Sequence, residues 1–227
     1  AAITLNEGTD SGTGIGTRVL ERDTATYTGN AEGAYAGFGT LATPIAGAAS
    51  YTDTVMAGNA YKYRYVITDS AGNSTSYTSA SILKVIGATS KYTLSAPADI
   101  TAGGSRAAYT VTRYDVYNNS VTFGAETVYL YTNSMGTNAA FYNAATAGTV
   151  IISVAIADGA SSANFWYYDE KSGNLVITVS DAAPANGATG IADATDALTV
   201  APASASKLKV TAGASTMTAG GSLATTI

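Results

Sequence analysis

The sequence contains neither cysteine nor histidine. Their absence removes the commonest thiol nucleophile, the commonest general base and the commonest metal-ligating side chains together. Without histidine no Ser-His-Asp triad can form, and the G-x-S-x-G motif of a nucleophile elbow is also missing. We therefore expect a protein that is not an enzyme, with no catalytic residues and no cofactor.

Charged residues are scarce as well, at 12%, with a formal net charge of −5. The basic surface that neutralises phosphates is missing, which excludes nucleic acid as a partner. No apolar run is long enough to span a bilayer, and the first ten residues lack the basic and apolar regions of a signal peptide. We expect no transmembrane segment, and any signal peptide to lie outside this sequence.

The residues that are present are mostly Ala, Gly, Thr, Ser, Val and Tyr, in short apolar runs separated by polar turns. This composition is typical of strands and turns. Over a dozen residues, the spacing of an amphipathic helix nowhere fits better than strict alternation. The sequence therefore predicts an all-β fold.

An internal repeat divides the chain. Residues 90–111 and 206–227 align, and both contain the pentapeptide TAGGS, at 101–105 and at 218–222. This period suits an immunoglobulin-like sandwich. We expect TAGGS to be a turn in which Gly103 and Gly104 supply positive φ angles.

The stretch YKYRYVITDSAGN (61–73) places Tyr61, Tyr63 and Tyr65 on alternate positions. In a strand all three rings lie on one face. A binding platform and the inside of a small β-domain are the two readings, and we interpret the stripe as the inside. Lys62 and Arg64 then lie on the solvated face.

The stretch VMAGNAYKYRYVITDSAGN resembles the late strands of a fibronectin type III domain, and SGTGIGTRVLERDTATYTG is similar to the preceding part of such modules in bacterial surface proteins. The resemblance implies a corner in which Val55 and Gly58 precede Tyr61, whose hydroxyl bonds back to the corner backbone. Members often carry a cysteine where this sequence has Ala60, so a family disulfide would be absent. We assign residues 1–87 to this sandwich.

Residues 88–204 resemble a bacterial Ig-like repeat. The matching pieces are ITAGGSRAAYTVTRYDVYNNSV and SSANFWYYDEKSGNLVITVSD. Asp115 and Asn119 bracket a turn in which relatives usually have glycine before the Asn, and Asn118 stands there because asparagine tolerates the left-handed conformation. Residues 86–90 form a linker too short for free swinging, and residues 205–227 are the expected first strands of a further repeat.

These resemblances imply a non-enzymatic, extracellular structural module of a prokaryotic surface layer, stalk or fibre, whose partners are neighbouring copies or domains of the same protein. Two alternatives remain open. An adhesin module would bind cell-wall or host glycan or protein through apical loops such as 24–41, where Tyr27, Tyr35 and Phe38 lie among glycines. An accessory domain would serve a secreted carbohydrate-active enzyme.

Three kinds of modification or ligand site also stay open. Calcium would use loop carboxylates, for which turn-capping is the alternative reading. Asn73 and Asn118 begin N-x-[ST] triplets that accept glycans in suitable hosts. An isopeptide crosslink would join Lys91 to Asn174 beside Glu126. The calcium candidates are Asp10, Asp69, Asp115 and Asp158.

Overall fold

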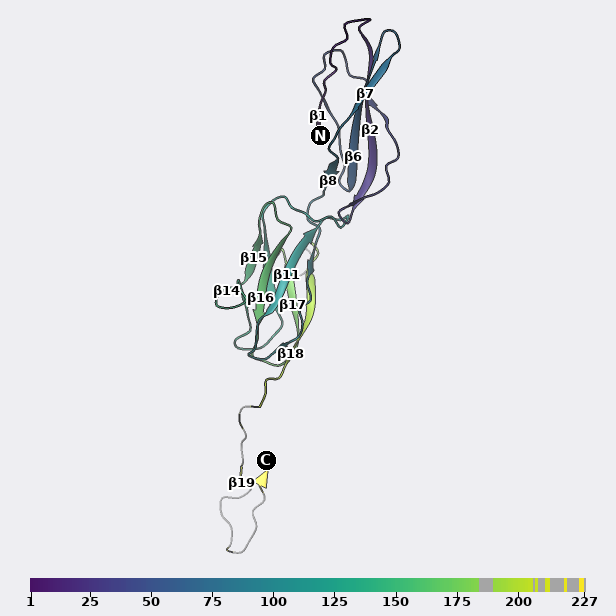
Figure 1. Ribbon diagram of the computed structural model, residues 1–227. Helices are drawn as coiled ribbons and strands as arrows, with labels where there is room; N and C mark the ends of the chain where they lie inside the picture. Colours follow the sequence, from purple (N-terminus) through teal and green to yellow (C-terminus); the bar gives the residue numbers. More distant parts are fainter. Residues whose placement is uncertain (184–189, 206, 208–210, 213–218, 220–224, 227) are drawn as a thin grey trace.

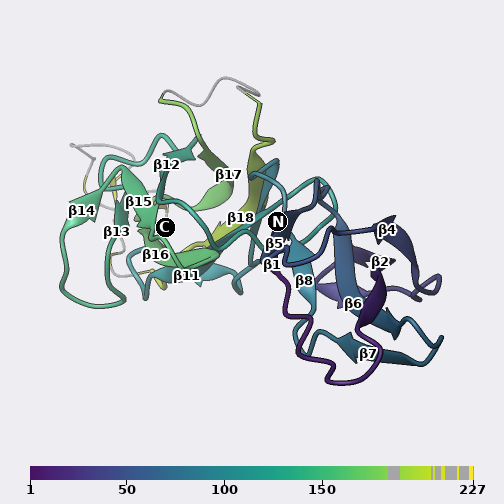
Figure 2. The same cartoon turned by 90° about the horizontal axis from the view of Figure 1, so that it is seen from above.

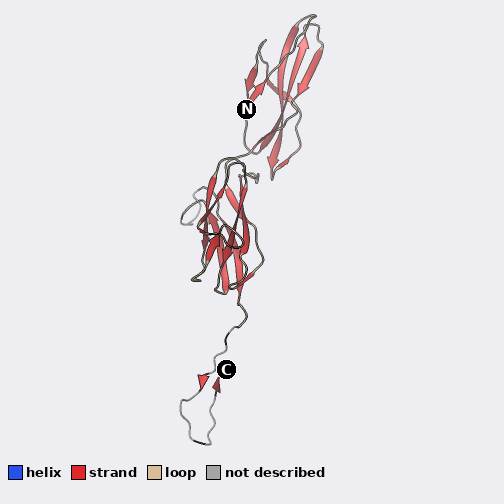
Figure 3. Cartoon of the chain, turned by 60° about the vertical axis from the view of Figure 1, so that its left-hand side comes forward, coloured by secondary structure: helices blue, strands red, loops and turns tan. Residues whose placement is uncertain are grey.

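The computed structural model describes residues 1–183, 190–205, 207, 211–212, 219 and 225–226. Within them every regular element is a β-strand, as Figure 3 shows. The predicted all-β fold is therefore confirmed. The described residues contain no helix that could cross a membrane.

The strands up to residue 85 form what we call the first sandwich. Strands β2 and β6 pair along most of their length, from Ile15 opposite Asp69 to Thr26 opposite Asn59. They anchor a sheet in the order β3-β2-β6-β7, with β4 also on β2 and β8 also on β6. A two-stranded sheet, β1-β5, packs across it through Leu5, Leu20 and Tyr65. The strands are β1 (Ala2–Thr4), β2 (Ile15–Thr28), β3 (Ala31–Glu32), β4 (Gly39–Ala42), β5 (Ser50–Thr52), β6 (Asn59–Asp69), β7 (Ser74–Thr78) and β8 (Leu83–Val85).

The strands from residue 91 to 201 form the second sandwich. Its two five-stranded sheets have the orders β10-β18-β17-β12-β15 and β14-β13-β16-β11-β9. Alternate residues of both sheets face inward, as expected for an antiparallel sandwich. The strands are β9 (Lys91–Leu94), β10 (Ile100–Thr101), β11 (Ala107–Tyr114), β12 (Glu126–Thr132), β13 (Ala140–Tyr142), β14 (Val150–Ile151), β15 (Ser153–Ile156), β16 (Ser162–Tyr168), β17 (Gly173–Ser180) and β18 (Ala194–Ala201).

Aromatic rings fill the core of the second sandwich. Phe165 and Tyr167 are fully buried, and the ring of Tyr109 stacks on Phe165 with centroids 5.2 Å apart. Arg113 is also buried; its guanidinium donates to Glu126 and to the carbonyls of Val121 and Gly124. A buried cation is tolerated because these acceptors replace its water.

The TAGGS turn at 101–105 departs from the expectation at one glycine. Gly103 has φ +71°, whereas Gly104 does not adopt a positive φ. Gly104 is required for a steric reason instead, because the Cβ of any other residue would lie only 2.9 Å from the carbonyl oxygen of Thr101. The amide of Gly104 donates to that same carbonyl, which draws the backbone close.

No named sheet in the described part of the chain combines strands of the two sandwiches, and residues 86–90 carry no strand. The two sandwiches follow each other lengthwise (Figure 1), and they lie side by side when seen from above (Figure 2). Beyond them β19 (Thr211–Ala212) pairs with β20 (Thr225–Thr226). Most of the expected further repeat at 205–227, including all of its TAGGS except Ala219, lies outside the described residues.

Candidate functional site: the junction between the two sandwiches

A hairpin of the first sandwich ends in a two-residue tip, Gly29–Asn30. Both residues have positive φ, 59° and 63°, and Thr28 pairs with Ala31 across the tip. This geometry belongs to a type I′ turn, which suits the twist of antiparallel strands. The tip therefore presents the Asn30 side chain at the end of β2, where Tyr27 precedes it.

The turn that follows β11 in the second sandwich faces this tip. The carboxylate of Asp115 organises it, since Oδ1 accepts the amides of Tyr117 and Asn119 at 2.9 and 2.8 Å. Oδ2 accepts the side-chain amide of Asn119 at 3.2 Å. Asn118 has φ +64°, the left-handed conformation that the sequence predicts for it.

Five hydrogen bonds join the tip to this turn. Asn119 accepts the amide of Asn30 at 2.9 Å and donates its own Nδ2 to the carbonyl of Tyr27 at 2.8 Å. Asn30 in turn accepts the amide of Ser120 at 2.9 Å and donates to the Ser120 hydroxyl at 3.0 Å. The amide of Gly29 donates to the carbonyl of Tyr117 at 3.1 Å. Each asparagine therefore both donates and accepts across the junction.

The linker and an aromatic ring complete the contact. The amide of Gly87 donates to Oδ2 of Asp115 at 2.9 Å. The ring of Tyr117 lies on the backbone of Gly58, where a Cβ would meet three ring carbons at 2.7 Å. Asp115 and Asn119 are 0% exposed. Because polar groups buried this deeply must keep their partners, the junction has one preferred geometry.

The tyrosine corner supports the junction from the first sandwich. Tyr61 is 3% exposed, and its hydroxyl accepts the amide of Met56 at 3.0 Å. This bond fixes the corner that carries Gly58, whose amide donates to Val85 and whose carbonyl accepts the amide of Tyr27. The corner at Gly58 thus connects the β2-β3 hairpin to β8, the last strand of the first sandwich. The ring of Tyr117 covers this corner.

The other tyrosines of the stripe are also buried. The hydroxyl of Tyr63 donates to the buried Asp53 at 2.8 Å, and Arg22 donates to the same carboxylate. Burial, with the hydrogen bond to Asp53, raises the pKa of Tyr63. Tyr65 belongs to the apolar cluster between the sheets. The stripe therefore lies inside the sandwich, and Tyr65 also reaches the wall of an open pocket described below.

The aromatic residues of loop 24–41 do not form an exposed cluster. Tyr27 is buried, while Tyr35 and Phe38 fold back over the outer face of the sheet. The ammonium of Lys62 lies 3.7 Å from the centroid of the Tyr35 ring, and the guanidinium of Arg64 lies 4.3 Å from that of Phe38. Each of these cation–π contacts occupies one face of its ring, the kind of surface on which a ligand would stack. They also partly cover the face expected to be solvated.

Three of the calcium candidates, Asp10, Asp69 and Asp115, accept hydrogen bonds within their own turns, whereas Asp158 accepts one from a distant loop. Asp10 accepts the amide of Gly12, and Asp158 accepts the amide of Gly124. Asp69 accepts two amides of its turn, as Asp115 does. Within the described ranges no three acidic side chains gather into a metal-binding group. For Asp10, Asp69 and Asp115 the observed geometry is that of turn-capping, and calcium binding stays a hypothesis.

The structure separates the residues of the expected isopeptide crosslink. Lys91 is bridged to Ala192, before β18 begins, and its ammonium contacts Asn118. Asn174 pairs instead with Thr199, near the other end of β18. At about 3.3 Å per residue, most of a strand length lies between them. The crosslink prediction is therefore wrong.

An open pocket of about 550 Å³ lies between residues 4–8 and strands β6 and β7. Tyr65, Ile67 and Tyr77 line it, and Glu7 is its acidic group. Glu7 is paired with Arg18, whose hydrogen bond lowers the pKa of that carboxyl. A single carboxylate that is already paired has no second group for proton transfer, so the pocket gives no reason to assign a reaction.

Asn30, Tyr117 and Ser120 carry much of the junction, and the sequence alone did not single them out. The Gly-Asn pair between two alternating stretches was a detectable hairpin signal. The partner of that hairpin was not detectable, because the bonded residues lie about 90 positions apart.

No family model matches the sequence, and no curated protein matches it significantly. Among solved structures, a β-glucuronidase of glycoside hydrolase family 2 is 15% identical over 83% of this chain and 19% of its own, with a TM-score of 0.38. A family 2 member from Bacteroides cellulosilyticus DSM 14838 is 13% identical over 84% of this chain and 25% of its own (TM-score 0.39). A β-glycosidase from Bacteroides vulgatus is 10% identical over 88% and 24% (TM-score 0.35). This chain spans a quarter or less of each, and at these scores the likeness carries no argument.

Proposed function

We propose that this chain is a structural, non-enzymatic part of an extracellular protein at a prokaryotic cell surface, in which successive sandwiches are held in a fixed relative orientation. The observation that carries the proposal is the junction built by Asn30, Asp115 and Asn119. Its partners are neighbouring domains or copies of the same surface protein.

An ordinary linker would not hold two sandwiches in this way. Domains joined by a short linker still move relative to each other unless a specific interface holds them. Each hydrogen bond stabilises the docked state by about 1 kcal/mol, and undocking leaves buried Asn119 and Asp115 to find new partners. Five such bonds restrict both swing and twist, which a spacer or lattice element requires.

The adhesin alternative loses its specific support, because the rings of Tyr35 and Phe38 are covered by Lys62 and Arg64. An accessory role beside a catalytic domain remains a different reading of the same rigid pair. The sequence of the full-length protein distinguishes them, since the accessory role requires a catalytic module in it.

The rigidity of the junction is testable by distance measurement between spin labels. The chain has no cysteine, so Ser76→Cys and Ala197→Cys, on exposed positions of β7 and β18, give one label in each sandwich. We expect a narrow distance distribution that Asn119→Ala broadens. Asn174→Ala, at an exposed asparagine of β17 far from the junction, is the matched control. A broad distribution in the otherwise unaltered chain would contradict the proposal.

A further inference from the structure

The turn that organises the junction occurs a second time in the chain. Residues 115–120 read DVYNNS, and residues 69–74, between β6 and β7, read DSAGNS. Asp, Asn and Ser recur at the first, fifth and sixth positions. At the fourth position the junction turn (115–120) has Asn118, and the turn at 69–74 has Gly72.

The backbone of the two turns is the same. In each, the Asp amide donates to the carbonyl of the fifth residue at 2.9 Å, and the amide of the fourth residue donates to the Asp carbonyl, at 3.2 Å in 69–74 and 3.1 Å in 115–120. The fourth residue has positive φ in both, 93° for Gly72 and 64° for Asn118. In each turn the residue before the aspartate pairs with the final serine: Thr68 pairs with Ser74, and Tyr114 pairs with Ser120.

The side chains also repeat their bonds. Oδ1 of Asp69 accepts the amides of Ala71 and Asn73 at 2.9 and 2.8 Å, as Asp115 does with Tyr117 and Asn119. Oδ2 of Asp69 accepts Nδ2 of Asn73 at 2.8 Å, where Asp115 accepts Asn119 at 3.2 Å. The atoms that hold the hairpin tip at 115–120 therefore have counterparts at 69–74.

Two of the counterparts at 69–74, the Asn73 Oδ1 and the Ser74 amide, are open, whereas the Ser74 hydroxyl shares a hydrogen bond with the Thr68 hydroxyl at 2.7 Å. Oδ1 of Asn73 accepts no hydrogen bond from the described residues, whereas Oδ1 of Asn119 accepts Asn30. Because the Asp69 amide donates to Asn73, Thr68 and Ser74 form a non-hydrogen-bonded pair, and the Ser74 amide points away from β6. The Ser120 amide, placed alike, donates to Asn30.

Burial distinguishes the two turns in the same way. Asp115 and Asn119 are fully buried, while Asn73 and Ser74 are exposed. A pocket of about 230 Å³ adjoins the exposed turn, lined by Asp69, Asn73 and Ser74 among others. The hydroxyl of Thr13 also hydrogen-bonds to the Asp69 carboxylate.

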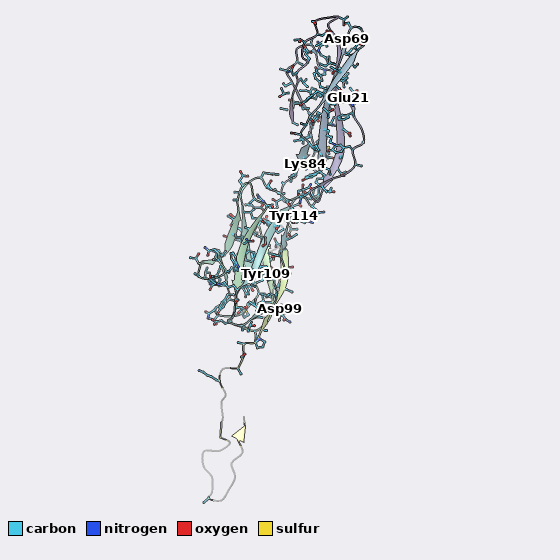
Figure 4. All side chains as sticks on the ribbon, viewed as in Figure 1. Glu21, Asp69, Lys84, Asp99, Tyr109 and Tyr114 are labelled. Atoms are coloured by element: carbon cyan, nitrogen blue, oxygen red, sulfur yellow. The ribbon has the colours of Figure 1, made fainter. Side chains whose placement is uncertain are left out.

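The two turns point in the same direction along the molecule. Figure 4 shows Asp69 at the end of the first sandwich that lies away from the second, and Tyr114 at the end of the second sandwich that faces the first. The turns follow different strands of their sandwiches, yet each closes the end that a preceding module would reach.

We propose that residues 69–74 are a second docking turn, which receives the tip of a two-residue type I′ hairpin with asparagine at its second position. The hairpin comes from a β-sandwich module that stands ahead of the first sandwich in a head-to-tail array. Asn73 accepts the amide of the incoming asparagine, and the Ser74 amide donates to its side chain. The inference rests on the proposed function and continues the established junction by one module.

The first experiment asks whether the sequence of the exposed turn can hold a hairpin tip. The substitutions Val116→Ser and Asn118→Gly convert the junction turn into DSYGNS, which otherwise matches the exposed turn and keeps the Tyr117 ring on Gly58. The label pair at Ser76→Cys and Ala197→Cys should keep its narrow distance distribution. If the unaltered junction is already broad, the proposed function fails; if it is narrow and the converted turn is broad, this inference alone fails.

The second experiment asks whether the exposed turn binds a hairpin. The probe is the peptide of residues 24–33, closed by a disulfide between added terminal cysteines and carrying a nitroxide label. In the whole chain we expect paramagnetic relaxation of amides 70–75 and none in the TAGGS turn at 101–105. Replacing the tip asparagine of the peptide by alanine, or Asn73→Ala in the protein, should reduce the effect at least fivefold. No relaxation at 70–75, or equal relaxation with the alanine tip, overturns the proposal.

Discussion

Replacing Gly58 by alanine tests how the corner and the junction are coupled. Gly58 has φ +76°, and a methyl group there would sit 2.7 Å from three carbons of the Tyr117 ring. The substitution therefore has two separable effects. One is backbone strain within the first sandwich, and the other is a clash with the second.

The magnitudes follow from that separation. An alanine held in the left-handed conformation costs about 1–2 kcal/mol. Gly47→Ala is the matched control, since Gly47 has φ +73° and a Cβ there would meet nothing within 4 Å, so only strain applies. The clash at Gly58 adds to the strain because the ring must leave its place, and contacting residues commonly couple by about 0.5–3 kcal/mol.

A double-mutant cycle measures the coupling. We expect Gly58→Ala to destabilise the first sandwich by more than Gly47→Ala does, and by no more than Gly47→Ala once Tyr117→Ala is present. Hydrogen exchange of β6 amides reports the free energy of opening of the first sandwich, while the fluorescence of Trp166, the single tryptophan, follows the second. An equal cost of Gly58→Ala with and without the Tyr117 ring would refute the packing argument.

Three further outcomes are expected. Tyr61→Phe should destabilise the first sandwich by about 1 kcal/mol or more, because the Met56 amide loses its buried acceptor, and an unchanged melting temperature would contradict this. The hydrogen bond from Asn73 lowers the pKa of Asp69. The ionised Asp69 carboxylate therefore stabilises the fold at pH values above the ordinary pKa of aspartate, and this contribution is lost as the pH falls through the lowered pKa. Carbon-13 titration should show that Asn73→Ala moves the pKa of Asp69 upward. Burial and Glu32 raise the pKa of Tyr35 to about 12, so the difference between ultraviolet titrations of the unaltered chain and of Tyr35→Phe should show its phenolate forming near that pH, whereas a difference near the ordinary value would show the ring to be free.

The sequence predicted the parts of this structure that depend on local periodicity. The alternation of Tyr61, Tyr63 and Tyr65 gave the inner face of β6, and Asn118 adopts the conformation that its turn requires. Composition could not reveal that Tyr35 and Phe38 would be covered, because the covering cations come from a strand more than twenty residues away.

The junction could not be predicted from the sequence for a related reason. Gly29 and Asn30 indicate a tight turn, but nothing in them specifies a partner in another sandwich. The positions of Lys91 near the start and Asn174 near the end of the second sandwich left a crosslink between them open, but the direction of β18 places the two residues toward opposite ends. Contacts between residues that are distant in the sequence depend on the topology of the strands, and topology is difficult to predict from a single sequence.

The two ends of the first sandwich differ in kind. The Gly29–Asn30 tip lies at one end, and the Asp69–Ser74 turn lies at the other. An interface between unlike surfaces is heterologous, so repeating it gives a polar filament or a ring and never a two-fold pair. Each added module is then related to the last by one screw operation, whose angle is set by a few side-chain amides. In the head-to-tail array that we propose, a small change in the position of one asparagine would be multiplied along the array into a different helical pitch.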